Sequence, residues 1–242
     1  MRSALLLLVA VPCAAQPRPG ASGPEGPGTG APVYDVGGFG TLALTTGGFS
    51  VGGGVRSALS ARVRLVFDAG LGEVSDERET RFSGPGGVAI PSKYEYLVVA
   101  PLRAGAERRL FARQVEDNVR PFLRLGIGPT LALARPYFSD CNGNRRYERR
   151  ADCNGDGTAA PGEGEAVLSF YQSLARARPL VGAGATVAAG IHVGRSRRGL
   201  QTVAVAMRVD VLPTGVQLLE PDVQGLRRWF VTPEAALSLR LF

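Results

Sequence analysis

Lysine is almost missing from this sequence, since Lys93 is the only one among the 28 Lys and Arg residues. The formal net charge of +7 therefore comes from arginine, and we interpret the imbalance as a bias of genomic composition. A basic balance usually raises nucleic acid as a partner. Here, however, no stripe of basic residues with interleaved aromatic residues occurs, and the export signal described below also argues against it. We expect no nucleic-acid partner.

Long hydrophobic runs are missing as well. Beyond the first residues, every apolar stretch is broken by Gly, Pro or Arg within about a dozen residues, whereas a membrane-spanning helix needs about 20. This absence argues against a helical membrane protein. In lipid, only helices and closed barrels satisfy all backbone hydrogen bonds, so the exported chain is either a soluble protein or a β-barrel.

The N-terminus has the order of a secretory signal peptide. Arg2 supplies an early positive charge, the run Ala4–Val11 is apolar, and Ala14 and Ala15 are the small residues of a cleavage site. We expect residues 1–15 to be the signal peptide. The Pro- and Gly-rich residues 16–33 are then a flexible periplasmic tail, and residues 34–242 form the folded part.

Cysteine is scarce, with three in the chain. Cys13 lies in the expected signal peptide. Export places the other two in an oxidising compartment, where disulfides form and persist. We therefore expect a disulfide between Cys141 and Cys153.

The feature that the sequence does have is alternation. Segments of about 9 to 14 residues alternate between apolar residues and small or charged ones, which is the length and period of tilted membrane-spanning strands. In one segment Val203 and Met207 share one parity, whereas Arg208 and Asp210 share the other. We expect eight strands, at residues 35–45, 49–57, 62–74, 93–104, 119–133, 179–193, 201–212 and 229–242.

Alternation alone fits both a soluble barrel and a membrane barrel, so the less apolar face has to decide between them. That face is rich in Gly, Ala and Ser with isolated charges, whereas a water-exposed face would be dense in Lys, Glu, Gln and Thr. Small residues suit a crowded barrel interior, and the bulky, nearly charge-free parity suits lipid. We predict an all-β fold: an eight-stranded, antiparallel, transmembrane up-and-down β-barrel with a long extracellular insertion.

The charged residues of the interior parity form the first candidate site. Because an unpaired buried charge is costly, we expect these residues to pair with one another and to fill the lumen. Eight strands leave an interior just wide enough for their own side chains, so an open diffusion pore is not expected. The predicted lumen charge network comprises Arg64, Asp68, Glu95, Arg103, Arg124, Arg208, Asp210, Glu234 and Arg240, with Arg56 and Lys93 on the same parities.

The connections between the expected strands differ in length by side. Those after the second, fourth and sixth strands are modest, whereas those after the third, fifth and seventh are longer, and only the first hairpin breaks this order. Short periplasmic turns and long extracellular loops are the outer-membrane pattern.

Two adjacent runs carry a resemblance to a known family. They are Tyr94-Glu-Tyr-Leu-Val-Val-Ala-Pro-Leu-Arg-Ala-Gly and Val119-Arg-Pro-Phe-Leu-Arg-Leu-Gly-Ile-Gly-Pro-Thr-Leu. Together they resemble the small bacterial outer-membrane β-barrel domain proteins, which include OmpX-like proteins. The resemblance implies a barrel in the bacterial outer membrane, in contact with its lipid, and we expect a monomer.

The longest connection contains a calcium-loop pattern, which is the second candidate site. Its second half fits the template D-x-[DN]-x-[DN]-G-x5-E. In such a loop carboxylate, amide and carbonyl oxygens surround one Ca²⁺, and the glycine permits the sharp turn that brings them together. The expected ligands are the side chains of Asp152, Asn154, Asp156 and Glu163 and the carbonyl of Thr158.

A degenerate copy of the same pattern precedes it. Asp140, Asn142 and Asn144 stand at the ligand positions, but Arg145 replaces the glycine. The expected disulfide would join both copies within an extracellular loop at residues 139–165. The alternative is a turn rich in Asn, Asp and Gly that binds nothing, since such turns are common.

No catalytic site is expected. His192 is the only histidine, lies on the interior parity near the end of a strand, and has no apparent catalytic partners in the sequence. We therefore expect a structural or surface-interaction role. Two alternatives stay open: a narrow channel, and an enzyme that modifies lipids.

Overall fold

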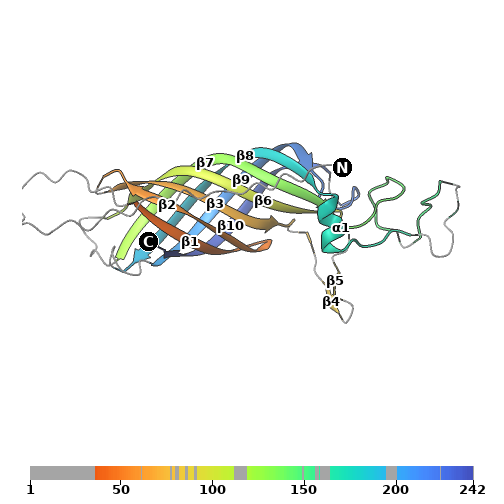
Figure 1. The fold of residues 1–242 in the computed structure, drawn as a ribbon, viewed down its shortest axis with the longest axis horizontal. Coiled ribbons are helices and arrows are strands. Elements are labelled where there is room, and N and C mark those ends of the chain that lie inside the picture. Colours follow the sequence, from red (N-terminus) through yellow and green to blue (C-terminus); the bar gives the residue numbers. More distant parts are fainter. Residues whose placement is uncertain are drawn as a thin grey trace, which may run out of the picture. The chain divides into compact units, whose positions relative to one another are not determined.

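The fold is taken from a computed structural model (Figure 1). It describes residues 36–60, 62–76, 78–79, 82–84, 87–89, 92–111, 119–148, 150–155, 158, 164–194, 201–223 and 225–241. The expected signal peptide and tail, at residues 1–33, lie outside this part of the chain.

Eight antiparallel strands close into one barrel, in the order β1-β10-β9-β8-β7-β6-β3-β2. Each strand pairs with its neighbours in the chain, apart from the small inserted hairpin, and the first strand pairs with the last. The predicted fold class is therefore confirmed. The bounds are β1 Val36–Thr45, β2 Gly48–Ala58, β3 Val63–Val74, β6 Glu95–Arg109, β7 Val119–Pro136, β8 Arg178–Val193, β9 Gln201–Val216 and β10 Arg227–Arg240.

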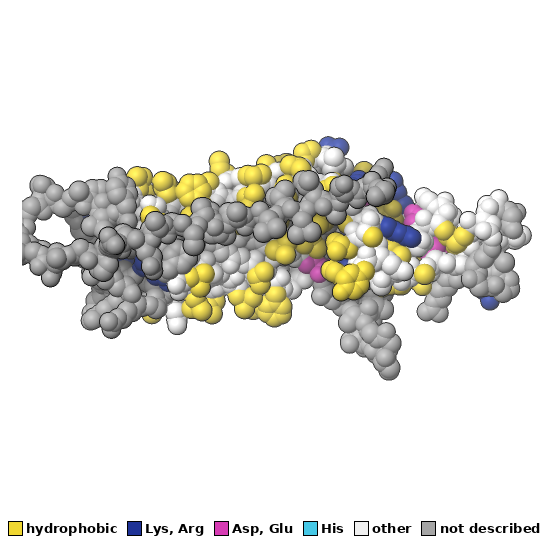
Figure 2. Space-filling view, in the orientation of Figure 1, with side chains coloured by type: hydrophobic (Ala, Val, Ile, Leu, Met, Phe, Trp, Pro, Cys, Tyr) yellow, Lys and Arg dark blue, Asp and Glu magenta, His cyan; other side chains and the backbone are white. Residues whose placement is uncertain are grey.

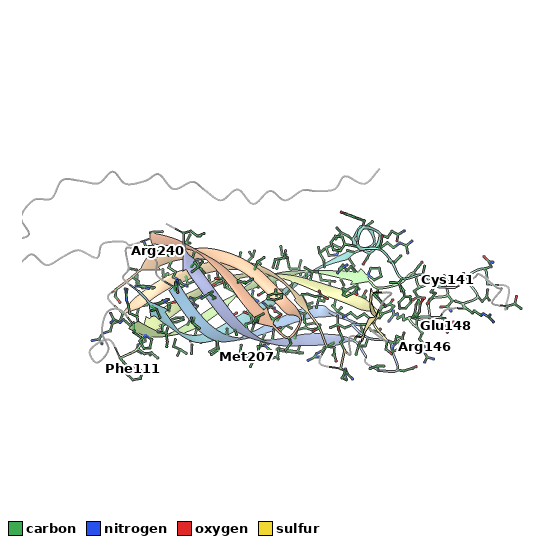
Figure 3. The ribbon with its side chains drawn as sticks, turned by 90° about the horizontal axis from the view of Figure 1, so that it is seen from below. Phe111, Cys141, Arg146, Glu148, Met207 and Arg240 are labelled. Atoms are coloured by element: carbon green, nitrogen blue, oxygen red, sulfur yellow. A yellow bond between two sulfur atoms is a disulfide. The ribbon has the colours of Figure 1, made fainter. Side chains whose placement is uncertain are left out.

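The alternation in the sequence corresponds to the outer and inner faces of the barrel wall. On β9, Val205 and Met207 are exposed on the outer face, whereas Arg208 and Asp210 are buried inside. Figure 3 shows Met207 on the outer side of the barrel, and Figure 2 shows hydrophobic side chains along the wall where described residues are visible. The exposed face is thus the apolar one, which is the arrangement of a barrel surrounded by lipid.

The small residues of the interior parity have a steric cause. At Gly182 on β8, a Cβ atom would lie 2.1 Å from the carbonyl oxygen of Val211 on β9. No larger residue fits there without a shift of the backbone. Glycine in a strand marks such close backbone approach.

The structure extends several predicted strands and adds elements that the sequence pattern did not indicate. β6 continues to Arg109, β7 to Pro136 and β9 to Val216, so these strands are longer than expected. A hairpin, β4 Phe82–Gly84 and β5 Gly87–Ala89, follows β3. A short helix, α1 Phe170–Ala175, precedes β8.

Helix α1 begins at a capping box. The backbone N–H of Gln172 donates to the hydroxyl oxygen of Ser169, and the Gln172 side chain accepts from the Ser169 backbone N–H. The motif Ser-x-x-Gln is a known sequence signal for a helix start, so this helix could have been anticipated. No helix among the described residues is long and apolar enough to cross a membrane.

The two ends of the barrel differ. One end carries the start of β1, the end of β10 and the connections β2–β3, β6–β7 and β8–β9; we call it the turn end. The other carries the connections β1–β2, β3–β6, β7–β8 and β9–β10; we call it the long-loop end. Figure 3 shows Phe111 and Arg240 at the turn end and Cys141, Arg146 and Glu148 at the long-loop end.

Aromatic side chains gather where the strands meet the long-loop end. Phe49 and Trp229 stand near the starts of β2 and β10, and both are exposed. Tyr96 and Tyr137 make an edge-to-face contact beside β6 and β7, with ring centroids 5.7 Å apart. Aromatic girdles of this kind mark the interface between lipid and water in membrane barrels.

Candidate functional site

The middle of the lumen is organised around Asp210. Its carboxylate accepts from the Arg103 guanidinium at 2.5 Å, from the Arg208 Nε at 2.8 Å and from the Thr130 hydroxyl at 2.5 Å. Arg208 also pairs with Glu234 at 2.5 Å. Two arginines therefore face two carboxylates, and the charges of these four residues balance. Such pairing is what allows buried charges to persist.

A cavity of about 110 Å³ adjoins this group of charges. Small residues such as Gly52, Gly126 and Ala188 line most of it, with Asp68 and Arg124 among the charged ones. Because a water molecule needs roughly 10–15 Å³ of such space, several waters fit. The space is large enough for water to hydrate the charge network.

A second polar cluster lies nearer the turn end and is centred on Glu107 of β6. Its carboxylate contacts His192 Nε2 at 2.7 Å and Arg124 at 2.9 Å, with Arg64 at 3.7 Å. His192 Nδ1 is in turn 2.7 Å from the Thr202 hydroxyl. His192 is therefore an interior residue, as its parity predicted, with a carboxylate and a hydroxyl partner that the sequence analysis did not identify.

These partners were not identified because β6 is longer than predicted. The predicted strand stopped at residue 104, so Glu107 was assigned to a turn; the structure continues the strand to Arg109. Glu107 then points into the lumen, level with β8 and β9. Its position on the parity of Arg103 was the available signal.

Enzymes that use a hydroxyl as nucleophile often place it beside an imidazole that in turn contacts a carboxylate. In this cluster, however, Thr202 is only 2% exposed. Arg56 donates to its hydroxyl at 3.3 Å, and the Phe122 ring stacks on His192 with centroids 4.4 Å apart. The hydroxyl is thus enclosed by protein, and the hydrogen bonds of the cluster connect β6, β8 and β9.

At the long-loop end the lumen is filled by apolar side chains. Leu97, Leu212 and Phe230 point inward there and are almost completely buried. The whole cluster comprises Val74, Leu97, Val99, Ala132, Ala134, Leu180, Leu212, Val216, Leu218 and Phe230; we call it the apolar plug. The sequence analysis expected charges to fill the interior, and this end corrects that expectation. At this end bulky residues occupy both the inward and the outward parity, so the sequence alternates least clearly here.

The remaining predicted network residues lie apart from Asp210. Arg124 links Glu107 to Asp68, at 4.0 Å from the latter. Glu95 lies at the long-loop end, 3.8 Å from Arg178. Arg240 is half-buried at the turn end. Lys93 is buried outside the strands and pairs with Glu79.

The long connection between β7 and β8 is closed by the expected disulfide, Cys141–Cys153, with Cα atoms 5.1 Å apart. Beside each cysteine the chain makes the same turn. Asp140 accepts from the backbone N–H of Gly143, and Asp152 accepts from that of Gly155, both at 2.7 Å. The two copies of the Asp-Cys-Asn-Gly motif therefore share one local structure.

Two glutamates organise the first copy. Glu165 accepts from the backbone N–H groups of Cys141 at 3.2 Å and Glu148 at 3.0 Å, and burial raises the pKa of its carboxyl. Glu148 accepts from the side-chain amides of Asn142 and Asn144. The loop is thus held by hydrogen bonds in addition to its disulfide.

The predicted calcium ligands are described only in part. Asp156 and Glu163 lie outside the described residues, whereas Asn154 and Thr158 are exposed. In the part of the chain that the structure describes, no three His, Cys, Asp or Glu side chains form a group that could hold a metal ion.

The loop rests on the neighbouring β9–β10 connection. Arg146 pairs with Asp222, Arg145 donates to the Gln217 side chain at 3.2 Å, and the Tyr147 backbone N–H donates to Glu220 at 3.0 Å. These contacts join two long-loop connections that are far apart in sequence.

A buried acid fixes the base of these loops. The Asp76 side chain is fully buried and accepts from Arg78 at 2.9 Å and Arg227 at 2.8 Å. Burial alone would raise the pKa of Asp76, but these hydrogen bonds and positive charges hold it below its usual value. The β3–β6 connection is thereby attached to the start of β10.

Sequence comparison finds no match: no protein-family model and no curated protein matches the chain. Solved structures give matches of low identity. Neisserial surface protein A is 9% identical over 85% of this chain and 94% of that chain, with a TM-score of 0.41. The N-terminal β-barrel domain of Pseudomonas aeruginosa OprF is 11% identical over 85% and 96%, with a TM-score of 0.37. The outer membrane enzyme PagL is 12% identical over 85% and 98%, with a TM-score of 0.36.

The location follows from the barrel itself. Its strands are closed without an edge, its outer face is apolar, charges near the middle of the strands such as Arg103 and Asp210 are turned inward, and aromatic residues mark one rim. These are the properties of bacterial outer-membrane barrels. The protein is an outer-membrane β-barrel whose wall contacts lipid.

Proposed function

We propose that the barrel is a closed membrane anchor that displays the β7–β8 connection, residues 137–177, as an interaction surface outside the cell. The apolar plug is the observation that carries this proposal. Leu97, Val99 and Leu212 are fully buried within it, and this packing supports a lumen that is closed at the long-loop end. A dry apolar barrier opposes the passage of ions.

The loop itself supports a display role. It is ordered by a disulfide, by Glu148 and Glu165, and by contacts with the β9–β10 connection. Ordering a loop before it binds lowers the entropic cost of association. We assign the barrel no enzymatic activity and expect it to be a monomer; turnover of labelled lipid by the purified protein would contradict the first of these assignments.

Epitope accessibility tests the orientation. A tag inserted after Gly143, which is exposed with φ of +73° and nothing near its Cβ position, should be detected on intact cells. A tag inserted after Leu59, in the turn between β2 and β3, should be detected only after permeabilisation. The reverse pattern would overturn the proposal.

Conductance tests the closed lumen. The purified protein in planar bilayers should give no steady single-channel currents, while a general porin inserted in parallel shows that the bilayer reports pores. Steady currents from the barrel would favour the narrow channel instead.

A second proposal is that Ca²⁺ binds the loop. It is favoured by the pair of Asp-Cys-Asn-Gly turns, which the disulfide holds together. Hard carboxylate and amide oxygens are the ligands that Ca²⁺ prefers. The strands pair with one another without this loop, so removal of calcium should loosen the loop and leave the barrel intact.

Calorimetric titration with Ca²⁺ is the direct test, and a Kd as weak as about 10⁻³ M is reasonable for an extracellular module. Chelation should speed proteolysis between residues 139 and 165. Asp152→Ala and Asp156→Ala should reproduce that effect, whereas Asp222→Ala, at another exposed acid of this end, should still bind. Absence of heat and of protection in the wild type would leave a disulfide-closed turn.

A further inference from the structure

Arg135 occupies an unusual place on the outer face of the barrel. It lies at the end of β7, directly opposite Tyr96 of β6 in the strand register. Its guanidinium carbon is 4.4 Å from the Tyr96 ring centroid and 5.0 Å from that of Phe170 on α1. The rings of Tyr96 and Phe170 therefore both contact the Arg135 guanidinium, and we call these three residues the bracket.

Arg135 differs from the arginines of the lumen in its partners. Among the described residues it makes no hydrogen bond and no ion pair, and its buried Nε atom has no acceptor. In the lumen, by contrast, Arg103 and Arg208 each contact a carboxylate. Cation–π contacts position a guanidinium but leave its N–H groups unsatisfied. A buried Nε without an acceptor also occurs at Arg103 and Arg124, so what distinguishes Arg135 is that no carboxylate among the described residues contacts its guanidinium.

The helix that completes the bracket is firmly placed. The Ser173 hydroxyl donates to the Pro136 carbonyl oxygen at 2.7 Å, which attaches α1 to the end of β7. The capping box fixes the start of the helix, directly before Phe170. Phe170 thus reaches Arg135 from a defined position, and its neighbour Tyr171 is 80% exposed.

The surroundings are those of the membrane boundary. Leu131 and Leu133 precede Arg135 on the same outward parity, and both are exposed on the lipid face. Arg178, which lies opposite Ala134, and Arg176 add positive charge nearby, and Glu95 is the carboxylate that pairs with Arg178. The bracket therefore stands where apolar wall gives way to charged head groups.

We propose that Tyr96, Arg135 and Phe170 form a binding site for the phosphate group of a phosphorylated glycolipid in the outer leaflet. The guanidinium donates its free N–H groups to two phosphate oxygens, a geometry that arginine matches well. The two rings hold the guanidinium plane, and the acyl chains lie along the outward face of β7. The site requires that the long-loop end faces outward, as proposed above.

Native mass spectrometry of the full chain in mild detergent tests the site, with bisphosphorylated lipid A and its dephosphorylated form as probes. The wild type should retain the phosphorylated lipid and release the other. Arg135→Gln should weaken retention about tenfold or more, in line with the loss of charge-assisted hydrogen bonds. Arg146→Gln, at an exposed arginine beyond the strands, should leave retention unchanged.

Two further readouts keep the test decisive. Phe170→Ala retains the charge but removes one ring, and we expect weaker retention with normal heat-modifiable migration, which shows that the barrel has folded. Equal retention by Arg135→Gln and the wild type would overturn the proposal. So would equal retention of the dephosphorylated lipid or of a glycerophospholipid. If the lipid site is overturned in this way, the proposed outward display of the loop is not affected, since the epitope tags test it separately.

Discussion

Asp210 shows how a single residue can stabilise a polar barrel interior. It is fully buried and contacts Arg103, Arg208 and Thr130, which come from three different strands. Removal of its charge would leave two guanidiniums facing each other in a medium that solvates them poorly. The cost of a broken buried pair is larger than the net gain from forming it.

Asp210→Asn should therefore lower the free energy of unfolding by about 3–5 kcal/mol, as expected when one partner of a buried ion pair is removed. Urea unfolding in detergent micelles measures this change. Asp222→Asn removes an exposed partner of Arg146 and should change stability by less than about 1 kcal/mol. A similar response from both variants would mean that the lumen is well hydrated and the Asp210 network contributes little.

The sequence indicated which charges point inward, because the period of a strand is two residues and parity follows directly from it. It did not indicate which charges meet. The contact between Glu107 and His192 depends on how strands β6, β7 and β8 are staggered, and that register is not contained in the alternation of any one strand. The site at Arg135 was missed because the arginine and the two rings that contact it come from three separate elements, β7, β6 and α1.

Some glycines that line the lumen leave no room for a Cβ atom, and Gly182 on β8, beside β9, is one of them. A Cβ atom at Gly182 would meet the Val211 carbonyl oxygen at 2.1 Å, whereas at Gly126 on β7 the nearest atom would be 3.6 Å away. The two glycines look equivalent in the sequence. Their surroundings in the barrel differ.

Gly182→Ala should lower the free energy of unfolding by about 1–3 kcal/mol, because the backbone must shift to admit the methyl group. Gly126→Ala should leave stability unchanged or raise it by up to about 1 kcal/mol, since alanine fits there and has fewer unfolded conformations. Heat-modifiable migration over a range of temperatures compares them. If Gly126→Ala were the more damaging change, the assigned register between β8 and β9 would be wrong.

At the scale of elements, strand number and order could be predicted and strand ends could not. Alternation fades at the end of β6, where Ala106 and Arg108 take the place of bulky residues on the outward parity, so this strand was expected to stop at residue 104. The hairpin β4–β5 and helix α1 lie in connections, where no hydrophobic period extends far enough to be read.

For the whole molecule, the apolar outer face should decide whether the chain assembles. Wild-type protein should fractionate with the outer membrane and migrate differently before and after boiling. Leu125→Arg places a charge on the lipid face and should cost roughly 2–4 kcal/mol near the midplane, with reduced heat-modifiable protein. Leu59→Arg, at an exposed leucine of the β2–β3 turn, should be tolerated. Equal tolerance of both changes would argue for a barrel surrounded by water.

The pairing of the first strand, β1, with the last, β10, closes the barrel. β1 and β10 pair over Phe39–Thr45 only, whereas β7 and β8 pair over the whole of Val119–Ala134. One contact of this seam, Thr41 with Ser238, joins residues 197 positions apart. Contacts of such long range form late, because the entropy of closing so large a loop must be overcome first. We therefore expect the seam to be the last ladder to form and the first to open, with the sheet keeping two unpaired edges until β10 pairs with β1.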